Sequence, residues 1–351
     1  FLQDIKLFNS NLYVIDEAFE YLVTQVAKGA KGQYFTPRHV IDMVIKMLNP
    51  KEDEYVIDPA AGSCGFTVHT IFHIAGQQFT NQKLPEHARE FAQNNVYGID
   101  FDIRAVKVSK ALNLIAGDGK TNVYKANSLD SSSWDDGIKA ALKPYMKRFP
   151  RDQDKDRENQ NKFKYFNFDV MLSNPPFAGD ISEKHILKEY ILAEKNGKIK
   201  KSLERDTLFL ERDFNLLKDG GRMAIVLPQG VFNNDNDKYI REFIMKNGRI
   251  LAVVSLHGNT FKPHTGTKTS ILFLQKWDDT ICPKKDDYTI FFAVSTKSGK
   301  DSSGDYIFLK DGNNETILDE HGHPKIDHDL NEIADDFIEF AKKERLSFMR
   351  N

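Results

Sequence analysis

Two adjacent prolines at the end of an apolar run constrain this chain more than any other feature. The run Val170-Met171-Leu172 is typical of a buried strand, and Ser173-Asn174-Pro175-Pro176-Phe177 follows it directly. A proline fixes φ and lacks an N–H, so two in succession cannot continue a strand. The backbone must leave the sheet as a stiff turn that holds the Asn174 amide, the Asn174 and Pro175 carbonyls and the Phe177 ring in a fixed relation. We predict a rigid clamp with a flat face beside it.

Such a clamp suits a planar exocyclic amine on an aromatic ring. The amine can donate its two N–H groups to the carbonyls while the ring stacks on Phe177. A turn that only ends a strand explains the same residues, because asparagine and proline are common in turns. The short motif leaves both interpretations open, so the rest of the chain has to decide between them.

Length, hydrophobic content and cysteine usage narrow the class of protein. With 351 residues, 40% of them hydrophobic, the chain can form one large α/β domain or two smaller ones. No apolar run approaches the roughly 20 residues that span a bilayer, so we expect a globular protein without a membrane partner. Cys64 and Cys282 are the only cysteines and have no metal-ligand spacing, which indicates a reducing cytoplasm. The start, Phe1-Leu2-Gln3-Asp4, resembles neither a signal peptide nor a natural initiator, so we expect a fragment.

The net charge of −2 argues against a domain that binds nucleic acid strongly by itself. Such domains usually carry a basic excess that neutralises phosphates. If the substrate is DNA or RNA, we therefore expect a partner to supply much of the binding affinity.

Apolar runs alternate with helical patterns along the chain, which predicts a Rossmann-like, doubly wound and mostly parallel α/β sheet. We expect strands, with the loop of the third included, at 55–57, 96–100, 123–128, 168–172, 222–228, 250–255, 270–274 and 288–294. We divide the chain into a helical segment at 1–30, a main domain at 31–276 and a strand, loop and helix extension at 277–351. The helical segment is interpreted as the end of a truncated domain.

A turn of small residues follows the first predicted strand, between residues 58 and 66, and leads into a helical pattern. Ligands bind at this position in doubly wound sheets, and glycines let them approach the backbone. The turn is not G-x-G-x-x-G, so a dinucleotide is weakly supported, and a purely structural turn would look similar. We expect the Cys64 thiol to serve packing rather than chemistry. The candidate binding residues are Asp58, Ala60, Gly62, Ser63, Cys64 and Gly65.

Asp100 ends the second strand, where an acid holds ribose hydroxyls in this architecture. A helix N-cap is the alternative role, and Asp102 can fill it without Asp100. Upstream of the first strand, we expect Thr36 to cap a helix whose first residue is Pro37. A capped surface helix does not explain two aromatic residues before the cap, which suit a flat ligand. The candidate segment is Gln33-Tyr34-Phe35-Thr36-Pro37-Arg38.

Three polar stretches carry no evident chemistry. Residues 137–167 are expected to be the least ordered part of the chain, with 151–162 as a solvated loop. The lysine-rich segment 181–201 is interpreted as a mobile region near the mouth of the site. An acidic helix is expected near residues 333–340.

Taken together, these motifs resemble the S-adenosylmethionine-dependent adenine-N6 DNA methyltransferases with γ-type motif order. The modification (M) subunit of type I restriction-modification systems is the most similar member. The resemblance covers residues 30 to 276 and includes the segments 220–228 and 261–274. It implies a class I methyltransferase fold and S-adenosyl-L-methionine as the cofactor.

The resemblance also implies residue roles. The segment from Gln33 to Pro37 looks like the part that closes over the methionine end of the cofactor, and the turn at 58–66 looks like its main binding turn. Asp100 matches the acid that holds the ribose. This chain has Asn127 where an acid often follows the third strand, so a contact there with the cofactor's adenine amino group is in doubt. The clamp matches the catalytic residues Asn174, Pro175, Pro176 and Phe177.

By the same resemblance, the substrate is an adenine flipped out of double-stranded DNA. A specificity (S) subunit chooses the sequence, and a restriction subunit joins the full complex. Related N-P-P-[FY] motifs also serve glutamine-N5 protein methylation and guanine-N2 RNA methylation. The motifs also fit a single-chain adenine methylase with its recognition domain elsewhere, or a non-catalytic assembly subunit. The Gln33-to-Pro37 segment favours DNA over the protein and RNA substrates.

Overall fold

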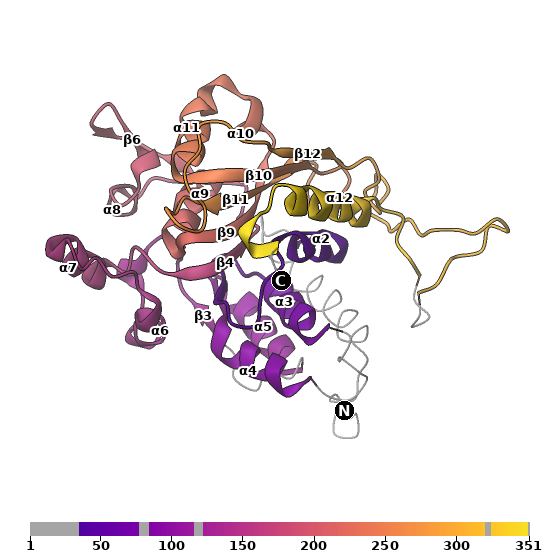
Figure 1. Ribbon diagram of the computed structural model, residues 1–351, viewed down its shortest axis with the longest axis horizontal. Helices are drawn as coiled ribbons and strands as arrows, with labels where there is room; N and C mark the ends of the chain where they lie inside the picture. The colour runs from indigo at the N-terminus through magenta and orange to yellow at the C-terminus, as the bar shows by residue number, and fades with distance from the viewer. Residues whose placement is uncertain (1–34, 77–83, 116–121, 320–323, 350–351) are drawn as a thin grey trace.

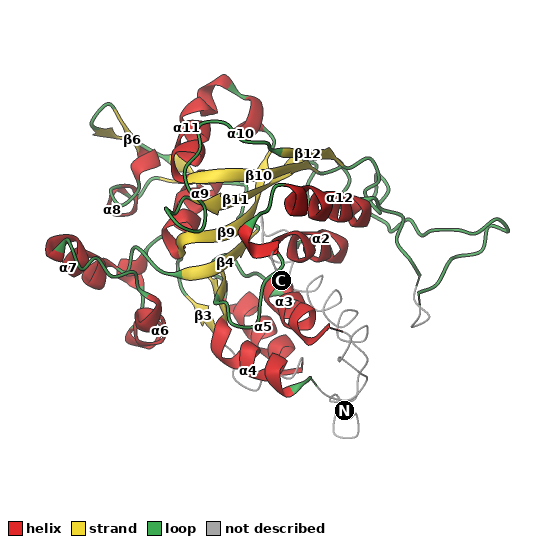
Figure 2. Ribbon diagram, viewed as in Figure 1, coloured by secondary structure: helices red, strands yellow, loops and turns green. Residues whose placement is uncertain are grey.

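The computed structural model describes residues 35–76, 84–115, 122–319 and 324–349. Eight strands form one sheet in the order β12-β10-β11-β9-β4-β1-β2-β3 (Figure 2). β11 runs antiparallel to β9 and β10, and the other neighbours are parallel. The strands are β1 (Val56–Asp58), β2 (Val96–Asp100), β3 (Val123–Lys125), β4 (Phe168–Ser173), β9 (Leu217–Pro228), β10 (Gly248–Ser255), β11 (Thr269–Lys276) and β12 (Phe291–Val294). Each predicted strand has a counterpart here, so the predicted doubly wound sheet is confirmed.

Helices cover both faces of the sheet because its central strands are buried on both sides. Along β4, Val170 and Leu172 pack in a core with α2, α3 and α12, whereas Met171 packs with α6, α9 and α11 on the other face. None of the helices in the described ranges is long and apolar enough to cross a membrane. The helices are α2 (Arg38–Leu48), α3 (Gly65–Ala75), α4 (Glu86–Asn95), α5 (Ile103–Ile115), α6 (Asp136–Leu142), α7 (Gln153–Lys162), α8 (Lys184–Leu187), α9 (Arg205–Leu216), α10 (Gly230–Asn233), α11 (Lys238–Asn247) and α12 (Leu330–Lys343).

The direction of chain winding reverses between β1 and β4. From β1 the chain builds outward to β2 and β3, while β4 and β9 extend the sheet in the other direction. β1 and β4 are parallel neighbours, with Val56 opposite Val170 and Ile57 opposite Met171. Ligands of open α/β sheets bind outside the carboxyl ends of the strands at such a switch point. The turn after β1 and the clamp after β4 both start there.

The C-terminal segment packs on the same core as the sheet. β12 pairs with β10, and α12 lies beside α2 (Figure 1). Phe337 of α12 is fully buried, with its ring centroid 6.1 Å from that of Phe273 and 5.6 Å from that of Phe291. The acidic helix expected near 333–340 is therefore present and its apolar side is buried. The division at residue 276 stays a prediction, and the helix expected at 1–30 lies outside the described residues.

The expectation of a solvated loop at 151–162 is wrong, because α7 occupies most of it. The Asp152 carboxylate accepts from the Lys155 N–H at 2.9 Å and caps the helix. Asn159 is buried, and its amide donates to the Lys147 and Tyr165 carbonyls at 2.8 and 3.0 Å. A cap and one buried amide thus organise a helix that has almost no apolar side.

The lysine-rich segment 181–201 also has more structure than its composition suggests. Two short ladders lie in or beside it, formed by β5 (Asp180–Ile181) with β8 (Leu203–Glu204) and by β6 (Glu194–Lys195) with β7 (Lys198–Ile199). Its apolar residues form a small separate cluster with α9. Its mobility stays a prediction.

Candidate active site

The turn after β1 is held by hydrogen bonds within itself. The Ala60 N–H donates to the Asp58 carboxylate at 2.9 Å, and the Cys64 N–H donates to the Ala61 carbonyl at 2.6 Å. Gly62 has φ of +51°, where a Cβ would strain the backbone. Burial raises the pKa of Asp58 well above its ordinary value, which favours the neutral carboxyl. These hydrogen bonds and the positive φ of Gly62 define the shape of the turn.

Asp100 connects the end of β2 to this turn. Its carboxylate accepts from the Gly62 N–H at 2.8 Å and from the Asp102 N–H at 2.7 Å. Each oxygen keeps a second acceptor position, so hydroxyl groups can still donate to it. The cap role belongs to Asp102, which accepts from the Arg104 N–H at 2.8 Å just before α5. Burial raises the pKa of the Asp100 carboxyl above its ordinary value.

Cys64 is fully buried among Ala61, Val68, Val106 and Val123. Burial raises the pKa of its thiol to about 12, so the thiolate is not available near neutral pH. The thiol therefore packs the turn against the sheet, as predicted.

The clamp after β4 is hydrogen-bonded to the segment before α2. The Asn174 Nδ2–H group donates to the Thr36 hydroxyl at 2.9 Å, across 138 residues of sequence. The expectation that Thr36 caps α2 is wrong, because the helix begins at Arg38, with Pro37 at the N-cap position and no side-chain cap. The hydroxyl instead sets the orientation of the Asn174 amide.

These segments meet in one hollow at the switch point. The clamp contributes Asn174, and the segment before α2 contributes Phe35 and Thr36. The remaining lining residues are Ile41, Asp58, Ala60, Ala61, Gly62, Ser63, Gly65 and Phe66. Three predicted motifs far apart in sequence are thus brought together.

Phe177 lies beside an aromatic residue that the sequence did not single out. Its ring centroid is 6.3 Å from that of Phe261, and the two planes are at 87°. Phe261 is buried, whereas Phe177 is half-buried. From the same loop, His264 lies with its ring centroid 6.3 Å from that of Phe35, edge to face. The loop at 261–268, part of the segment 261–274 that the resemblance includes, therefore borders both the clamp and the upstream segment.

Phe101 is a second residue that sequence reasoning missed. It follows Asp100 directly, and its side chain is 73% exposed at the carboxyl end of β2. A large apolar ring in water beside Asp100 is suited to stacking on a flat group. The signal was an aromatic residue directly after a strand-ending acid.

Eight other predicted positions within the described residues do not line this hollow: Pro37, Arg38, Cys64, Asp100, Asn127, Pro175, Pro176 and Phe177. Asn127 accepts from the Leu129 N–H at 3.1 Å, which is a local turn at the end of β3. Arg38 forms an ion pair with Asp42 at 3.5 Å along α2. Within the clamp, Pro175 is buried and Pro176 is half-buried. Gln33 and Tyr34 lie outside the described residues.

A family model for N-6 DNA methylases matches residues 11–347, nearly the whole chain. The chain belongs to the N-6 DNA methylase family. The family predicted from the motifs is therefore confirmed.

Curated relatives of this methylase-family chain include methylase subunits of type I restriction enzymes. The EcoEI methylase subunit of Escherichia coli is 24% identical over 273 residues, covering 76% of this chain and 47% of that protein. The StySPI methylase subunit of Salmonella potsdam is 26% identical over 253 residues, covering 71% and 41%. The chain spans about half the length, or less, of these relatives.

Solved structures show the same fold. A modification subunit of a putative type I restriction enzyme from Vibrio vulnificus aligns with a TM-score of 0.54 and 20% identity, covering 90% of this chain and 63% of that one. A putative class I S-adenosylmethionine-dependent methyltransferase from Listeria monocytogenes aligns with a TM-score of 0.58 and 19% identity, covering 83% and 76%. The predicted class I methyltransferase fold is thereby confirmed.

Proposed function

We propose that this chain is the modification subunit of a type I restriction-modification system. It transfers a methyl group from S-adenosyl-L-methionine to N6 of an adenine flipped out of double-stranded DNA. The observation that carries the proposal is the hydrogen bond from Asn174 to Thr36, which joins the clamp to the upstream segment beside the turn after β1. A strand-ending turn alone does not require that long-range contact.

The residues present fit S-adenosyl-L-methionine. The Asp100 carboxylate, oriented by two backbone N–H groups, would accept from the ribose hydroxyls. The exposed Phe101 ring beside it would stack on the cofactor's adenine. The turn around Gly62 and Ser63, together with Phe35, would enclose the methionine end. When bound, the cofactor supplies an electrophilic methyl group.

The clamp would prepare the adenine amine for methylation. The amine is a poor nucleophile because its lone pair is delocalised into the ring. The Asn174 side-chain oxygen and the Pro175 carbonyl would accept its two hydrogens, which favours a pyramidal nitrogen with an available lone pair. Phe177 would stack on the flipped base. The chain then acts by positioning and electrostatics and needs no covalent intermediate.

Partner subunits complete the proposal. The chain's net charge of −2 supports modest intrinsic affinity for DNA, since phosphate contacts dominate such binding. A specificity subunit would select the sequence, and a restriction subunit would join the full complex. Relatives named as methylase subunits support this assembly.

Nucleoside mass spectrometry tests the proposed reaction. Duplex DNA is incubated with S-adenosyl-L-methionine and the chain, with and without a co-expressed specificity subunit. We expect N6-methyladenine with wild type and its loss in Asn174→Ala, while calorimetry shows nearly unchanged cofactor affinity for that variant. Cofactor binding without transfer in the complete complex would support a non-catalytic subunit. Selective methylation by the chain alone would support a single-chain methylase.

A further inference from the structure

A small lobe begins immediately after the catalytic clamp. β5 starts at Asp180, three residues after Phe177, and pairs with β8, so residues 180–204 close on themselves at their base. The Arg205 N–H donates to the Gly179 carbonyl at 3.3 Å where the lobe joins α9. The lobe is thus attached next to the clamp at both of its ends.

The interior of the lobe is fixed to the body of the protein. The Glu211 carboxylate of α9 accepts from the N–H groups of Ile191 and Leu192 at 2.8 Å each. The Tyr190 hydroxyl donates to the Leu129 carbonyl at 2.9 Å. Leu192 is buried in the lobe's apolar cluster. These contacts hold the backbone immediately before the tip.

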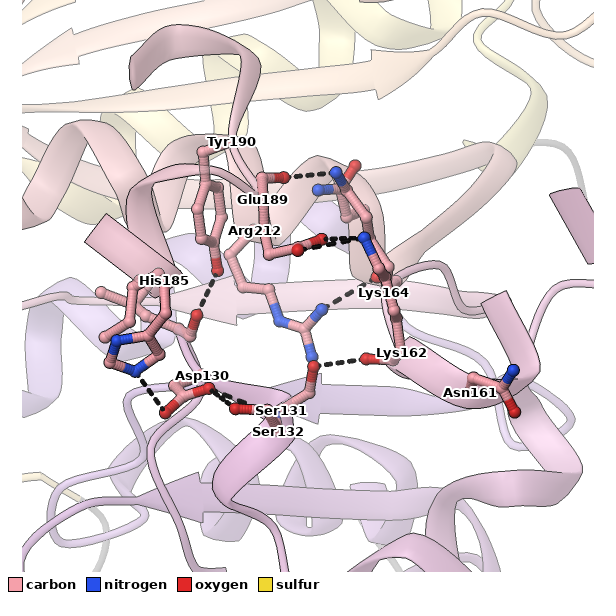
Figure 3. A pocket seen from close by; sticks show the side chains of 13 residues that line it. Asp130, Ser131, Ser132, Asn161, Lys162, Lys164, His185, Glu189, Tyr190 and Arg212 are labelled. Carbon is pink, nitrogen blue, oxygen red and sulfur yellow. Dashed lines mark hydrogen bonds and ion pairs between the residues drawn. The ribbon is translucent and has the colours of Figure 1, made fainter. Parts of the chain in front are cut away.

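A second set of contacts holds the lobe from the side of α7 (Figure 3). Lys162 forms an ion pair with the Glu189 carboxylate at 3.0 Å, and Lys164 donates to the Glu189 carbonyl. Arg212, which is buried, donates to the Lys164 carbonyl at 2.8 Å. The lobe therefore presents its tip from a fixed base.

The tip is a basic hairpin made by β6 and β7. Asn196 and Gly197 have φ of 53° and 73°, as a two-residue hairpin turn requires. All residues from Glu194 to Ile199 are exposed, and β6 stands out from the body in Figure 1. Residues 194–201 contain four lysines and one glutamate, a net charge of +3 in a chain whose total is −2.

The lysines of this hairpin are available for an external partner. Within the described ranges, Lys195, Lys198 and Lys201 form no ion pair. Lys200 lies over the Tyr239 ring at 3.9 Å. At the base of the lobe, the exposed Arg205 adds a cation next to the clamp. Positive charge is therefore concentrated at the hairpin tip, whereas the base of the lobe carries Arg205 beside the exposed acids Asp180 and Glu204.

We infer that this hairpin, Lys195 to Lys201, contacts the phosphate backbone of the duplex that flanks the target base. The inference rests on the proposed function, because it requires a duplex at the clamp. DNA follows from the charge and the shape: a two-stranded ribbon fits the roughly 12 Å major groove, and lysines neutralise phosphates. Contacts of this kind position the duplex without reading its sequence.

Fluorescence anisotropy with a labelled duplex, from 50 to 200 mM salt, tests the inference. The full chain is compared with Lys195→Gln/Lys198→Gln/Lys200→Gln/Lys201→Gln. The slope of log affinity against log salt is negative, and losing each phosphate contact reduces its magnitude by about 0.9, so we expect the magnitude to fall by roughly 2 to 4. We also expect at least tenfold weaker binding at 50 mM salt. The double variant Lys195→Gln/Lys198→Gln, which leaves Lys200 on Tyr239, should show about half the change in slope.

The matched control removes four exposed lysines outside the lobe, two on the arm after β12, which projects away from β6 in Figure 1, and two at the end of α12. The control is Lys310→Gln/Lys325→Gln/Lys342→Gln/Lys343→Gln, with the same change in net charge. Its salt slope should equal that of wild type. Equal losses in both variants, no loss in the hairpin variant, or no duplex affinity in wild type would overturn the inference. Loss of specificity-subunit binding with unchanged DNA affinity would overturn it in favour of a protein contact.

Methyl transfer separates this inference from the proposed function. At saturating DNA, the hairpin variant should transfer methyl groups at the wild-type rate, because the clamp is intact. If wild type binds the duplex through the hairpin yet methylates no adenine in the complete complex, the proposed function fails and the DNA contact stands. If wild type methylates adenine and the hairpin variant keeps its affinity, only the inference fails.

Discussion

Acid should destabilise the folded chain through one buried histidine. His39 of α2 is 4% exposed, and its ring is stacked on that of His328 with centroids 4.9 Å apart. Burial, with the nearby positive charges of His328 and Lys300, lowers the pKa of His39 from 6.5 to about 3, and Asp42 opposes this only partly. The folded state therefore holds a neutral imidazole.

The sign and size of the effect follow from proton linkage. Below pH 6.5 the unfolded chain binds a proton at His39 that the folded chain does not, so stability falls as pH decreases from 6.5 toward 3. At pH 5 this residue lowers the free energy of unfolding by about 2 kcal/mol relative to its value above pH 6.5, since each pH unit below the unfolded-state pKa costs roughly 1.4 kcal/mol. Above pH 6.5 His39 is neutral in both the folded and the unfolded chain, so it no longer lowers the free energy of unfolding.

Urea unfolding at pH 7.5 and pH 5.0, for wild type and His39→Leu, measures this contribution. His328, His73 and His264 also have pKa values lowered by burial and contribute in both proteins. The difference between the two pH dependences isolates His39, whatever the variant's stability at pH 7.5. Between pH 7.5 and pH 5.0, we expect the free energy of unfolding to fall by about 2 kcal/mol more in wild type than in the variant. Equal losses, or an NMR titration of His39 near its ordinary pKa, would refute the reasoning.

Three further predictions concern the site and the fold. Thr36→Val should lower the methylation rate at least tenfold at saturating S-adenosyl-L-methionine, while calorimetry shows a much smaller change in cofactor affinity, since the hydroxyl orients Asn174. Asp100→Ala should weaken cofactor binding at least tenfold, and unchanged affinity in a folded variant would exclude the ribose role. Arg222→Met should lower the free energy of unfolding by about 3 kcal/mol in urea, because it leaves the half-buried Glu54 without its partner at 2.6 Å.

Strands and turns were predictable where local chemistry decides them. The apolar run before Asn174 and the two prolines predict that the strand ends at Leu172, one residue before the observed end of β4 at Ser173. Once the sheet order is known, parallel pairing of β1 with β4 brings the turn and the clamp together. These features depend on residues close in sequence and on a general rule for α/β sheets.

Features that depend on distant partners were not predictable. α7 has no apolar stripe, so its pattern resembled a loop, and its stability depends on Asp152 and Asn159. Phe261 is more than 80 residues from Phe177 in sequence, and only the folded chain places the two rings edge to face. A single sequence contains no signal for such pairs.

At the start of α2, the local preference for a threonine cap and the observed structure disagree. A threonine before a proline should cap the helix, which typically contributes about 1 kcal/mol. Here the Pro37 carbonyl accepts from the N–H groups of Val40 and Ile41, at 3.0 and 3.1 Å, and no side chain caps the first turn. The Thr36 hydroxyl accepts from Asn174 instead. Local rules are typically broken at functional sites, where stability is given up for geometry. A missing cap alone does not mark a functional site, since α4 also follows a proline, Pro85, without a side-chain cap. The hydrogen bond from Asn174 is what supports placing Thr36 and Asn174 in one site.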